Sequence, residues 1–327
     1  MSFIAVLLAL LLEQVKPLPR GNVVHDALTG WIAGTTRNFD AGKAHHAWIV
    51  WSITVLVPTV LCAAAYLALT QVRLGLAFDV AVLYLTLGFR QFSHYFTDIR
   101  AALERGDEIE ARRLLAEWRH LDASDLPTSA FLRHLIEHSL LAAHRHVFGV
   151  FFWFVLLSTV GLGPAGAVLY RLAEFVARYW SYRSGSAGIA VNERLGALSL
   201  RIFQVLDHVP ARLTASGFAV VGNFEEAVNC WRRDASLWKH DNEGVILAAA
   251  AGAVGVQLGG GSAPGLTPDR AKTFEAGALP GSAAAEGSTP GEVPQLGHLR
   301  SVVALVWRSV VLWMLLLALL SLANLIG

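Results

Sequence analysis

Residues 47–70 read AWIVWSITVLVPTVLCAAAYLALT, and this apolar run decides the class of fold. A helix needs roughly 17–25 mostly apolar residues to cross a bilayer, so the run is long enough to span one. Only the tripeptide QVR separates it from a second, shorter run, LGLAFDVAVLYLTLGF at 74–89. The two runs predict a helical hairpin in a membrane, with both flanking segments on the same side.

The composition of the chain agrees with a membrane protein. Hydrophobic residues make up 54% of the 327 residues and charged residues only 16%, with a mean hydropathy of +0.49, whereas charged residues make up about a quarter of a soluble domain. The net charge of +1 offers no concentrated basic face, so nucleic acid is excluded as a partner. The hydrophobic composition predicts membrane lipids as partners instead. The two cysteines, Cys62 and Cys230, provide neither a disulfide framework nor a CxxC metal site, so no metal is predicted and no cofactor is evident.

The N-terminal residues form a short apolar segment, SFIAVLLALLL. About ten apolar residues are too few to span a bilayer. Glu13 also stands where a signal peptide would have its small-residue cleavage site. We therefore predict an uncleaved helix that lies at the membrane interface or packs against the helical bundle.

Residues 147–180 contain a second hairpin. Their aromatic and aliphatic run is interrupted by GLGPAG at 161–166, and six arginines against three acidic residues follow between 171 and 212. A single crossing would leave this arginine excess outside, contrary to the positive-inside rule, so a re-entrant pair of helices is favoured. The same rule predicts a multi-pass protein of the bacterial inner membrane with its charged loops in the cytoplasm.

The predicted fold is all-α, a polytopic helical membrane protein with short or re-entrant helices and an amphipathic cytoplasmic helical region. In that region acidic and basic residues alternate with apolar positions at helical spacing. A later stretch rich in Gly, Pro, Ser and Ala is typical of a flexible linker. The segments are 1–90, an interfacial helix with the transmembrane hairpin; 91–146, the charged cytoplasmic helical region; 147–260, a core with broken membrane helices; 261–300, the linker; and 301–327, a C-terminal transmembrane helix.

Two short motifs match enzyme signatures by letter only. HLIEH at 134–138 fits the H-x-x-E-H pattern of zinc proteases, but no downstream segment offers the third ligand that such a site needs. GLGPAG fits the G-x-G-x-x-G pattern, but it follows no β-strand, and Pro164 removes a backbone N–H that would face phosphate. We interpret the first, with His134 and His138, as polar residues of an interfacial helix and the second as a tight turn.

Asp79 lies inside the apolar run 74–89. A carboxylate within a membrane is costly, which makes this residue a candidate functional group. Because the run is short, Asp79 could equally lie close to an interface. The sequence leaves both interpretations open.

The stretch LDHVPARLTA at 206–215 sets a proline and an arginine among apolar residues. Pro210 disfavours helical geometry at the residue before it, so we predict a helix that ends near Leu206 or Asp207 and another that starts at Pro210. Arg212 then lies in a first helical turn, where a cation is unfavourable. It either extends to lipid headgroups or pairs with Asp207, or it points into a cytoplasm-facing cavity to hold a phosphate or carboxylate.

Several of these segments together resemble one protein family. The most specific are GPAGA at 163–167 with YR at 170–171, VPARL at 209–213 and GAVGVQLGG at 252–260. They make the chain similar to the CobD/CbiB family of cobalamin biosynthesis and to its relative AmpE, an inner-membrane protein linked to β-lactamase regulation. The resemblance covers most of the chain apart from 261–297.

The resemblance implies an activity and a site. CobD/CbiB proteins join adenosylcobyric acid to aminopropanol or its phosphate as an amide, with ATP. A corrinoid intermediate is then an expected partner, and ATP with Mg²⁺ is expected only if the activity is retained. No catalytic residue is assigned. The residues assigned to substrate binding or to architecture are Arg212, Pro210, Asp207, Asn242 and Arg171.

The chain departs from the acidic motifs of that family. The A-E-N-x-x-D-G motif corresponds to 143–149, the N-T-x-D motif to 174–177 and the D-D pair to 203–204, and the expected acids are absent there. These losses favour a scaffold without its catalytic set, closer to AmpE, which would have other membrane or cytoplasmic proteins as partners. The GAVGVQLGG segment is closer to CobD/CbiB. Two hypotheses follow: an enzyme of late cobalamin biosynthesis, or a non-catalytic AmpE-like membrane sensor.

Overall fold

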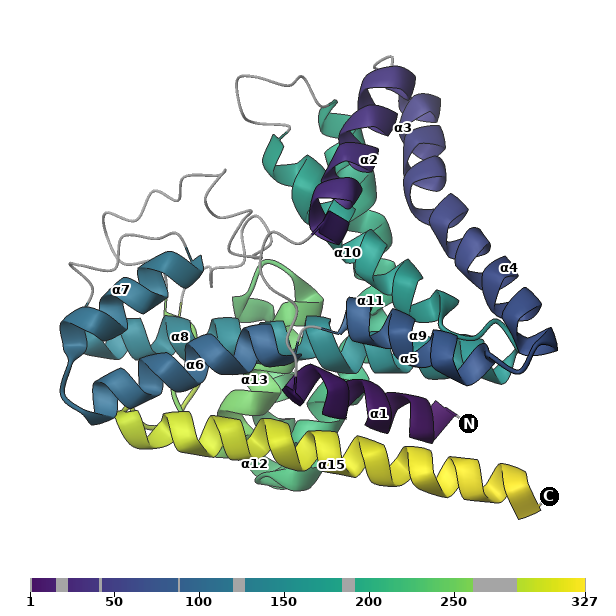
Figure 1. Ribbon diagram of the computed structural model, residues 1–327. Helices are drawn as coiled ribbons and strands as arrows, with labels where there is room; N and C mark the ends of the chain where they lie inside the picture. The colour runs from purple at the N-terminus through teal and green to yellow at the C-terminus, as the bar shows by residue number, and fades with distance from the viewer. Residues whose placement is uncertain are drawn as a thin grey trace. The chain divides into compact units, whose positions relative to one another are not determined.

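The computed structural model describes residues 2–15, 23–40, 43–87, 89–119, 127–183, 192–260 and 287–326. Within these ranges every regular element is a helix (Figure 1). The only β-type pairing there consists of two isolated bridges, Val256 with Glu292 and Gly259 with Ser288. The predicted all-α class is therefore confirmed.

The chain forms two compact units. The first comprises Met1–Arg90, Arg145–Leu206 and Leu317–Gly327, and the second comprises Gln91–His144 and Asp207–Leu316. The five segments predicted from the sequence follow composition and motifs, whereas the two units follow contacts in space. The five-segment division stays a prediction.

The first unit has a helical core tied together by aromatic side chains. The Trp180 indole N–H donates to the Thr36 hydroxyl at 3.0 Å within the core, and the rings of Tyr170 and Phe203 lie 5.7 Å apart. Its elements are α1 (Ser2–Val15), α2 (Val23–Phe39), α3 (Ala44–Trp51), the π-helix η1 (Ser52–Leu56), α4 (Val57–Gln71), α5 (Gly75–Thr86), most of the π-helix η2 (His144–Phe148), α9 (Gly149–Thr159), α10 (Ala165–Arg183), and parts of α11 (Glu193–Val221) and α15 (Leu296–Ile326).

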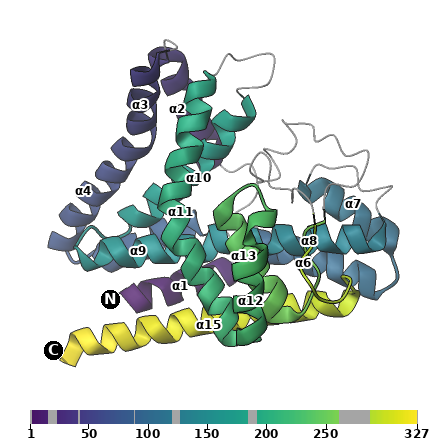
Figure 2. The same ribbon diagram turned by 180° about the vertical axis from the view of Figure 1, so that it is seen from behind.

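The second unit contains the charged helices and a closely packed helix pair. α12 and α13 lie side by side, as Figures 1 and 2 show from opposite sides. A Cβ added to Gly252 would lie 2.3 Å from the Glu226 carbonyl oxygen, so only glycine permits this approach. The elements are α6 (Phe89–Glu104), α7 (Glu108–Arg119), α8 (Thr128–Ala143), α12 (Phe224–Asp234), the 3₁₀-helix η3 (Ala235–Leu237), α13 (Asp241–Val254), and the remaining parts of α11 and α15.

Three helices are long and apolar enough to cross a membrane: His45–Gln71, Thr128–Thr159 and Leu296–Ala323. The first contains the predicted run 47–70, and the third covers residues 301–323 of the predicted C-terminal helix. Large apolar side chains are exposed on both, for example Leu61 at 64% and Val311 at 63%. Such surfaces suit lipid rather than water. Together with the helical architecture, these spans confirm a helical membrane protein.

The second of these helices differs from the sequence-based expectation. The sequence divides this region at 146, with the charged helical region before that residue and the membrane core after it. The structure instead continues from α8 through the π-helical turn η2 into α9, as one helix over Thr128–Thr159. No proline separates the two parts, and π-turns occur as insertions within α-helices rather than as ends.

The predicted turn at GLGPAG is confirmed between α9 and α10. Gly161 and Gly163 adopt φ values of 80° and 56°, which favour glycine. After the turn the helices approach closely, because a Cβ on Gly166 would lie 1.9 Å from the Trp153 carbonyl oxygen. The glycines of this family-like motif therefore serve the turn and the contact between the two helices.

The predicted helix break at Pro210 is wrong. α11 continues from Glu193 to Val221 with Pro210 inside it. Proline has no N–H, so the carbonyl oxygen four residues earlier, that of Leu206, loses its helical donor. The Trp153 indole Nε1 donates to this oxygen at 3.1 Å. A donor from another helix thus offsets the lost backbone bond.

Trp153→Phe is expected to lower the free energy of unfolding by about 1–3 kcal/mol beyond its packing loss, because it leaves the Leu206 carbonyl without a donor. In a Pro210→Ala background the restored backbone N–H can bond to that carbonyl, so the cost of Trp153→Phe should shrink. Unfolding of the four proteins in detergent micelles gives the coupling energy. An equal cost of Trp153→Phe in both backgrounds would contradict this explanation.

The Gly-rich segment after α13 is held by backbone pairing to residues 287–292. Gly255 caps α13 in the left-handed conformation, with φ 76°. The Gln257 N–H donates to the Glu292 carbonyl at 2.8 Å, and the Thr289 N–H donates to the Leu258 carbonyl at 2.8 Å. Residues 261–286 of the predicted linker lie outside the described residues, whereas 287–300 include this pairing and the start of α15.

Candidate functional site

A buried group of charged side chains lies on α10 and η2 in the first unit. Arg178 donates to Glu174 from Nε at 2.5 Å and from Nη2 at 3.2 Å, and Arg171 donates from Nη1 at 3.3 Å. Glu174 is 1% exposed, and Arg178 and Arg145 are also buried. Arg145 acts electrostatically on Glu174. We call Arg145, Arg171, Glu174 and Arg178 the arginine cluster.

The three guanidinium groups keep Glu174 ionised. Burial alone raises the pKa of this carboxyl, but the charges of Arg178 and Arg171, the hydrogen bond from Arg178 and the charge of Arg145 outweigh burial. Together they lower the pKa of Glu174 to about 2. Three guanidinium groups therefore act on this one carboxylate.

His146 borders the arginine cluster. Its Nδ1 is buried and has no hydrogen-bond partner among the described residues. The charges of Arg171, Glu174, Arg178 and Arg145 all act on its ring. No described residue forms a hydrogen bond with this buried nitrogen.

A hydrogen-bonded chain of three buried side chains lies in the second unit. His144 Nε2 lies 2.8 Å from Asp207 Oδ1, and His144 Nδ1 lies 2.9 Å from the Thr214 hydroxyl. With its proton on Nε2, the imidazole donates to the carboxylate and accepts from the hydroxyl. All three side chains are buried. The arrangement gives Asp207 a buried hydrogen-bond donor, and it joins His144 of η2 to α11.

Arg212 and Asn242 come together in the second unit. Arg212 Nη1 donates to the His208 carbonyl at 2.9 Å and to Asn242 Oδ1 at 3.2 Å. Arg212 is half-buried and Asn242 is buried. The sequence offered Asp207 as a partner for Arg212, but Arg212 bonds to Asn242. Its Nε and Nη2 have no hydrogen-bond partner within the described ranges, so these donors can meet a ligand.

The other three residues predicted for substrate binding or architecture have other surroundings in the structure. Pro210 lies inside α11. Arg171 belongs to the arginine cluster. Asp207 bonds to His144 in the chain described above. The assignment of the five residues to substrate binding or to architecture stays a prediction.

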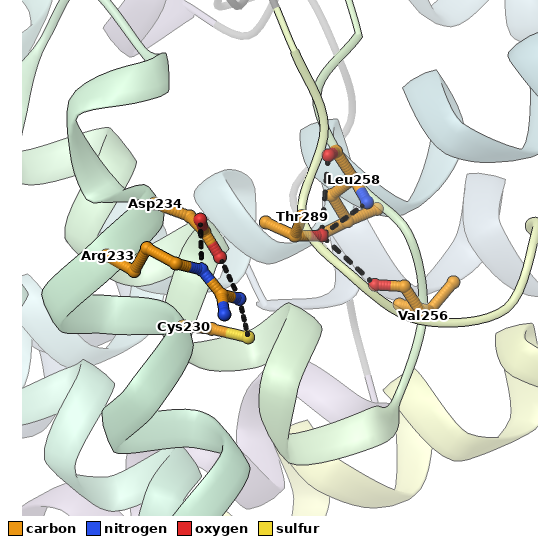
Figure 3. A network of polar contacts seen from close by, with 6 residues as sticks. All are labelled: Cys230, Arg233, Asp234, Val256, Leu258 and Thr289. Carbon is orange, nitrogen blue, oxygen red and sulfur yellow. Dashed lines mark hydrogen bonds and ion pairs between the residues drawn. The ribbon is translucent and has the colours of Figure 1, made fainter.

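A cavity of about 300 Å³ lies in the second unit at α12 and the end of α13. Cys230 lines it, and Figure 3 shows its sulfur near Arg233, which forms an ion pair with Asp234 at 2.8 Å. Burial raises the pKa of the Cys230 thiol, which makes it a weak nucleophile at neutral pH. The lining residues are Asn223, Glu226, Cys230, Gly252, Ala253, Val254, Gly255, Pro290 and Gly291.

Thr289 holds the chain near this cavity. Its Oγ1 accepts the Leu258 N–H at 2.8 Å and lies 3.4 Å from the Val256 carbonyl oxygen, as Figure 3 shows. Thr289 is fully buried. One side chain thus fixes the backbone of the GAVGVQLGG segment.

The HLIEH residues form packing and backbone contacts. Glu137 accepts the Gly259 N–H at 2.8 Å, and His134 Nδ1 lies 3.8 Å from the same carboxylate. Over the ranges that the structure describes, no group of three or more His, Cys, Asp or Glu is placed to hold a metal ion. The glutamate of this motif therefore fixes the Gly-rich segment.

Asp79 is buried within α5. The residue is 4% exposed, and its Oδ1 has no hydrogen-bond partner in the described part of the chain. The interface interpretation and the functional interpretation both remain predictions.

Comparison with known protein families identifies the family of this chain. The family model described as CobD/Cbib protein matches residues 2–275. The chain belongs to the CobD/CbiB family. It is 33% identical to "Cobalamin biosynthesis protein CobD" of Stutzerimonas stutzeri over 96% of both chains. It is also 37% identical to the protein of that name from Chromobacterium violaceum, over 56% of this chain and 55% of the relative.

A third relative, "Cobalamin biosynthesis protein CobD" of Mycobacterium tuberculosis, is 29% identical over 67% of each chain. No solved structure matches. The matches give no support to the AmpE-like alternative.

The structure shows what occupies the positions where family acids were expected. Residues 143–149 form the π-turn and its flanks, where His144 bonds to Asp207 of another helix. The segment 174–177 begins with Glu174, the centre of the arginine cluster. Sequence reasoning missed Glu174 as a site residue, although arginines three residues before it and four after it are a readable helical pattern. Nothing in the sequence signals the His144–Asp207 contact.

Proposed function

We propose that this CobD/CbiB-family protein acts in late cobalamin biosynthesis. The proposed reaction joins the carboxyl group of adenosylcobyric acid to the amine of aminopropanol or its phosphate. The product is an amide, and ATP drives its formation. The observation that carries the proposal is the similarity to the CobD protein of Stutzerimonas stutzeri over 96% of both chains. A corrinoid intermediate is the proposed partner.

Arg212 and Asn242 are the proposed substrate-binding residues. Arg212 Nη1 bonds to Asn242 Oδ1 and to the His208 carbonyl, and Nε and Nη2 have no hydrogen-bond partner within the described ranges. A planar guanidinium binds carboxylate or phosphate through two parallel hydrogen bonds. This pair is therefore suited to hold an anionic group of the substrate.

The chain's own residues do not form a resident metal site within the described ranges. If the activity is retained, Mg²⁺ is proposed to bind together with the phosphates of ATP.

The protein is expected to rescue a bacterium that lacks its CobD gene, measured as growth that depends on added cobyric acid. Arg212→Ala should abolish or strongly reduce rescue, because loss of a charged hydrogen bond costs about 1.5–3 kcal/mol, roughly ten- to a hundredfold in binding. Arg300→Ala is the matched control, since that side chain is 72% exposed. No rescue by a stably expressed wild-type protein would refute the proposed function.

We further propose that the protein is a multi-pass protein of the bacterial cytoplasmic membrane, in contact with membrane lipids and with its charged loops in the cytoplasm. The three apolar helices support the membrane assignment, and the arginine excess near the second hairpin supports the orientation. A reporter fused after Ser184, which lies outside the described residues, should report a cytoplasmic location. A periplasmic signal there would contradict the orientation.

A further inference from the structure

The cavity at α12 and the end of α13 is separate from the proposed substrate-binding residues. All of its lining residues belong to the second unit, and it shares none with the Arg212–Asn242 pair. Its volume is about 300 Å³, which is at the lower end of the range for small-molecule sites. A ligand of a few non-hydrogen atoms therefore has room there.

One face of α12 and its cap borders the cavity. The lining residues Asn223, Glu226 and Cys230 follow one another at intervals of three and four residues, which places them on the same side of the helix. Glu226 brings a carboxylate that is open to solvent. The Asn223 side chain accepts the Glu226 N–H at 3.3 Å and so caps the helix. This face therefore gives the cavity an accessible negative charge.

The C-terminal end of α13 forms another wall. Its last residues, Gly252 to Val254, and its cap Gly255 line the cavity. The Ala253 carbonyl accepts the Asn223 N–H at 3.1 Å, whereas the Gly252 and Val254 carbonyls have no donor among the described residues. Carbonyl groups at the end of a helix carry partial negative charge. This wall therefore favours a cation as well.

The charges beside the cavity do not cancel. The N-terminus of α12 carries partial positive charge, but its first turn holds two carboxylates, Glu225 and Glu226. Among the described residues that line the cavity, none is Lys, Arg or His. Arg233, further along α12, forms an ion pair with Asp234 at 2.8 Å. A positively charged ligand therefore suits the cavity better than an anion.

Size and chemistry decide which cation fits. Ca²⁺ takes roughly six to eight oxygen ligands at about 2.3–2.6 Å, whereas the lining residues bring one carboxylate to a cavity far larger than an ion. Other lining residues are apolar: Ala253, Val254 and Pro290. A carboxylate and carbonyl groups accept hydrogen bonds from an ammonium group, and the apolar residues can contact an alkyl chain. We propose that this cavity binds a small alkylammonium compound.

Binding of propylammonium to the purified full-length protein in detergent tests this proposal, by ligand-observed NMR at pH 7 with neutral 1-propanol as the uncharged analogue. Wild-type protein should bind propylammonium saturably, and Glu226→Gln should weaken binding about tenfold or more, because the charged hydrogen bond is lost. 1-Propanol should bind about tenfold more weakly than propylammonium, and Glu226→Gln should not change its binding.

Glu225→Gln is the matched control. It removes the same charge from the same turn of α12, but Glu225 does not line the cavity. Its binding of propylammonium should therefore stay close to that of the wild type. Gel filtration and circular dichroism confirm that both variants are folded.

The source of the ammonium group is decided by a second arm, which rests on the proposed function. If the ligand is the amine substrate of that reaction, Glu226→Gln should need about tenfold more added aminopropanol than the wild type to rescue cobyric acid-dependent growth. If the ligand is another small amine, both proteins should rescue at the same aminopropanol concentration. Binding that depends on Glu226 supports the proposal in both cases.

Three results would overturn the proposal. They are no saturable binding of propylammonium by the wild type, equal effects of Glu225→Gln and Glu226→Gln, and binding of 1-propanol as tight as that of propylammonium. The binding arm uses neither ATP nor a corrinoid. Its failure and a failure of the wild-type protein to rescue growth are therefore separate results.

Discussion

Glu174→Gln is expected to lower the free energy of unfolding by about 3–5 kcal/mol, because it removes the carboxylate from a buried group of guanidinium charges. Glutamine keeps the size of the side chain but not its charge, so Arg178 and Arg171 lose their buried counter-ion. Denaturant unfolding of the purified protein in detergent micelles measures the loss.

Glu110→Gln provides the matched control for this result. Glu110 also pairs with an arginine three residues away, at 2.7 Å from Arg113 Nη2, but this pair is exposed to solvent. Exposed ion pairs contribute little to stability because water and salt screen them. We expect no measurable change for Glu110→Gln, and equal losses for the two substitutions would show that burial of the arginine cluster does not matter.

The effect of Glu174 should also depend on pH in one direction. Its pKa is lowered from an ordinary value of 4.5 to about 2 in the folded protein. The stabilisation is therefore fully present above about pH 4.5 and is lost as the pH falls toward 2. The difference between wild type and Glu174→Gln should close over that window, and a difference that stays constant to pH 2 would contradict the assignment.

Gly166→Ala is expected to have the second large effect, a loss of about 1–3 kcal/mol or more. The new Cβ would lie 1.9 Å from the Trp153 carbonyl oxygen, and because this atom is backbone, α9 and α10 must move apart. The shift would also disturb the bond from Trp153 to the Leu206 carbonyl. Thermal unfolding in micelles measures the loss.

Gly30→Ala separates this clash from the general effect of replacing a helical glycine. Gly30 lies within α2, and an added Cβ there would have nothing within 4 Å. Alanine favours a helix over glycine by about 0.5–1 kcal/mol, so this substitution should be neutral or stabilising. Destabilisation of similar size at both positions would refute the close-approach explanation.

The membrane architecture could be predicted from local sequence. The run 47–70 and the C-terminal run are apolar for longer than a bilayer is thick, which leaves few alternatives to a spanning helix. GLGPAG combines glycines and a proline, which set backbone geometry without help from distant residues. The short motifs GPAGA, VPARL and GAVGVQLGG were enough to indicate the family that the comparison confirmed.

The candidate site could be predicted only in part. Arg212, Asn242, Asp207 and Arg171 were selected from the sequence as one group, but the structure gives them different partners. A residue type and a motif indicate that a side chain can bind a charge. They do not indicate which opposite charge the fold brings to it.

The sequence by itself determined the properties that depend on neighbouring residues: the apolar lengths, the glycine turn and the family motifs. Only the tertiary structure decided the course of α11 and the burial of the charges. Local rules place a break at Pro210, and the helix continues because an indole N–H from α9 serves the carbonyl that proline leaves without a donor. His144 likewise bonds to Asp207, 63 residues away. Such contacts join residues far apart in the chain, so their energies do not enter any local pattern.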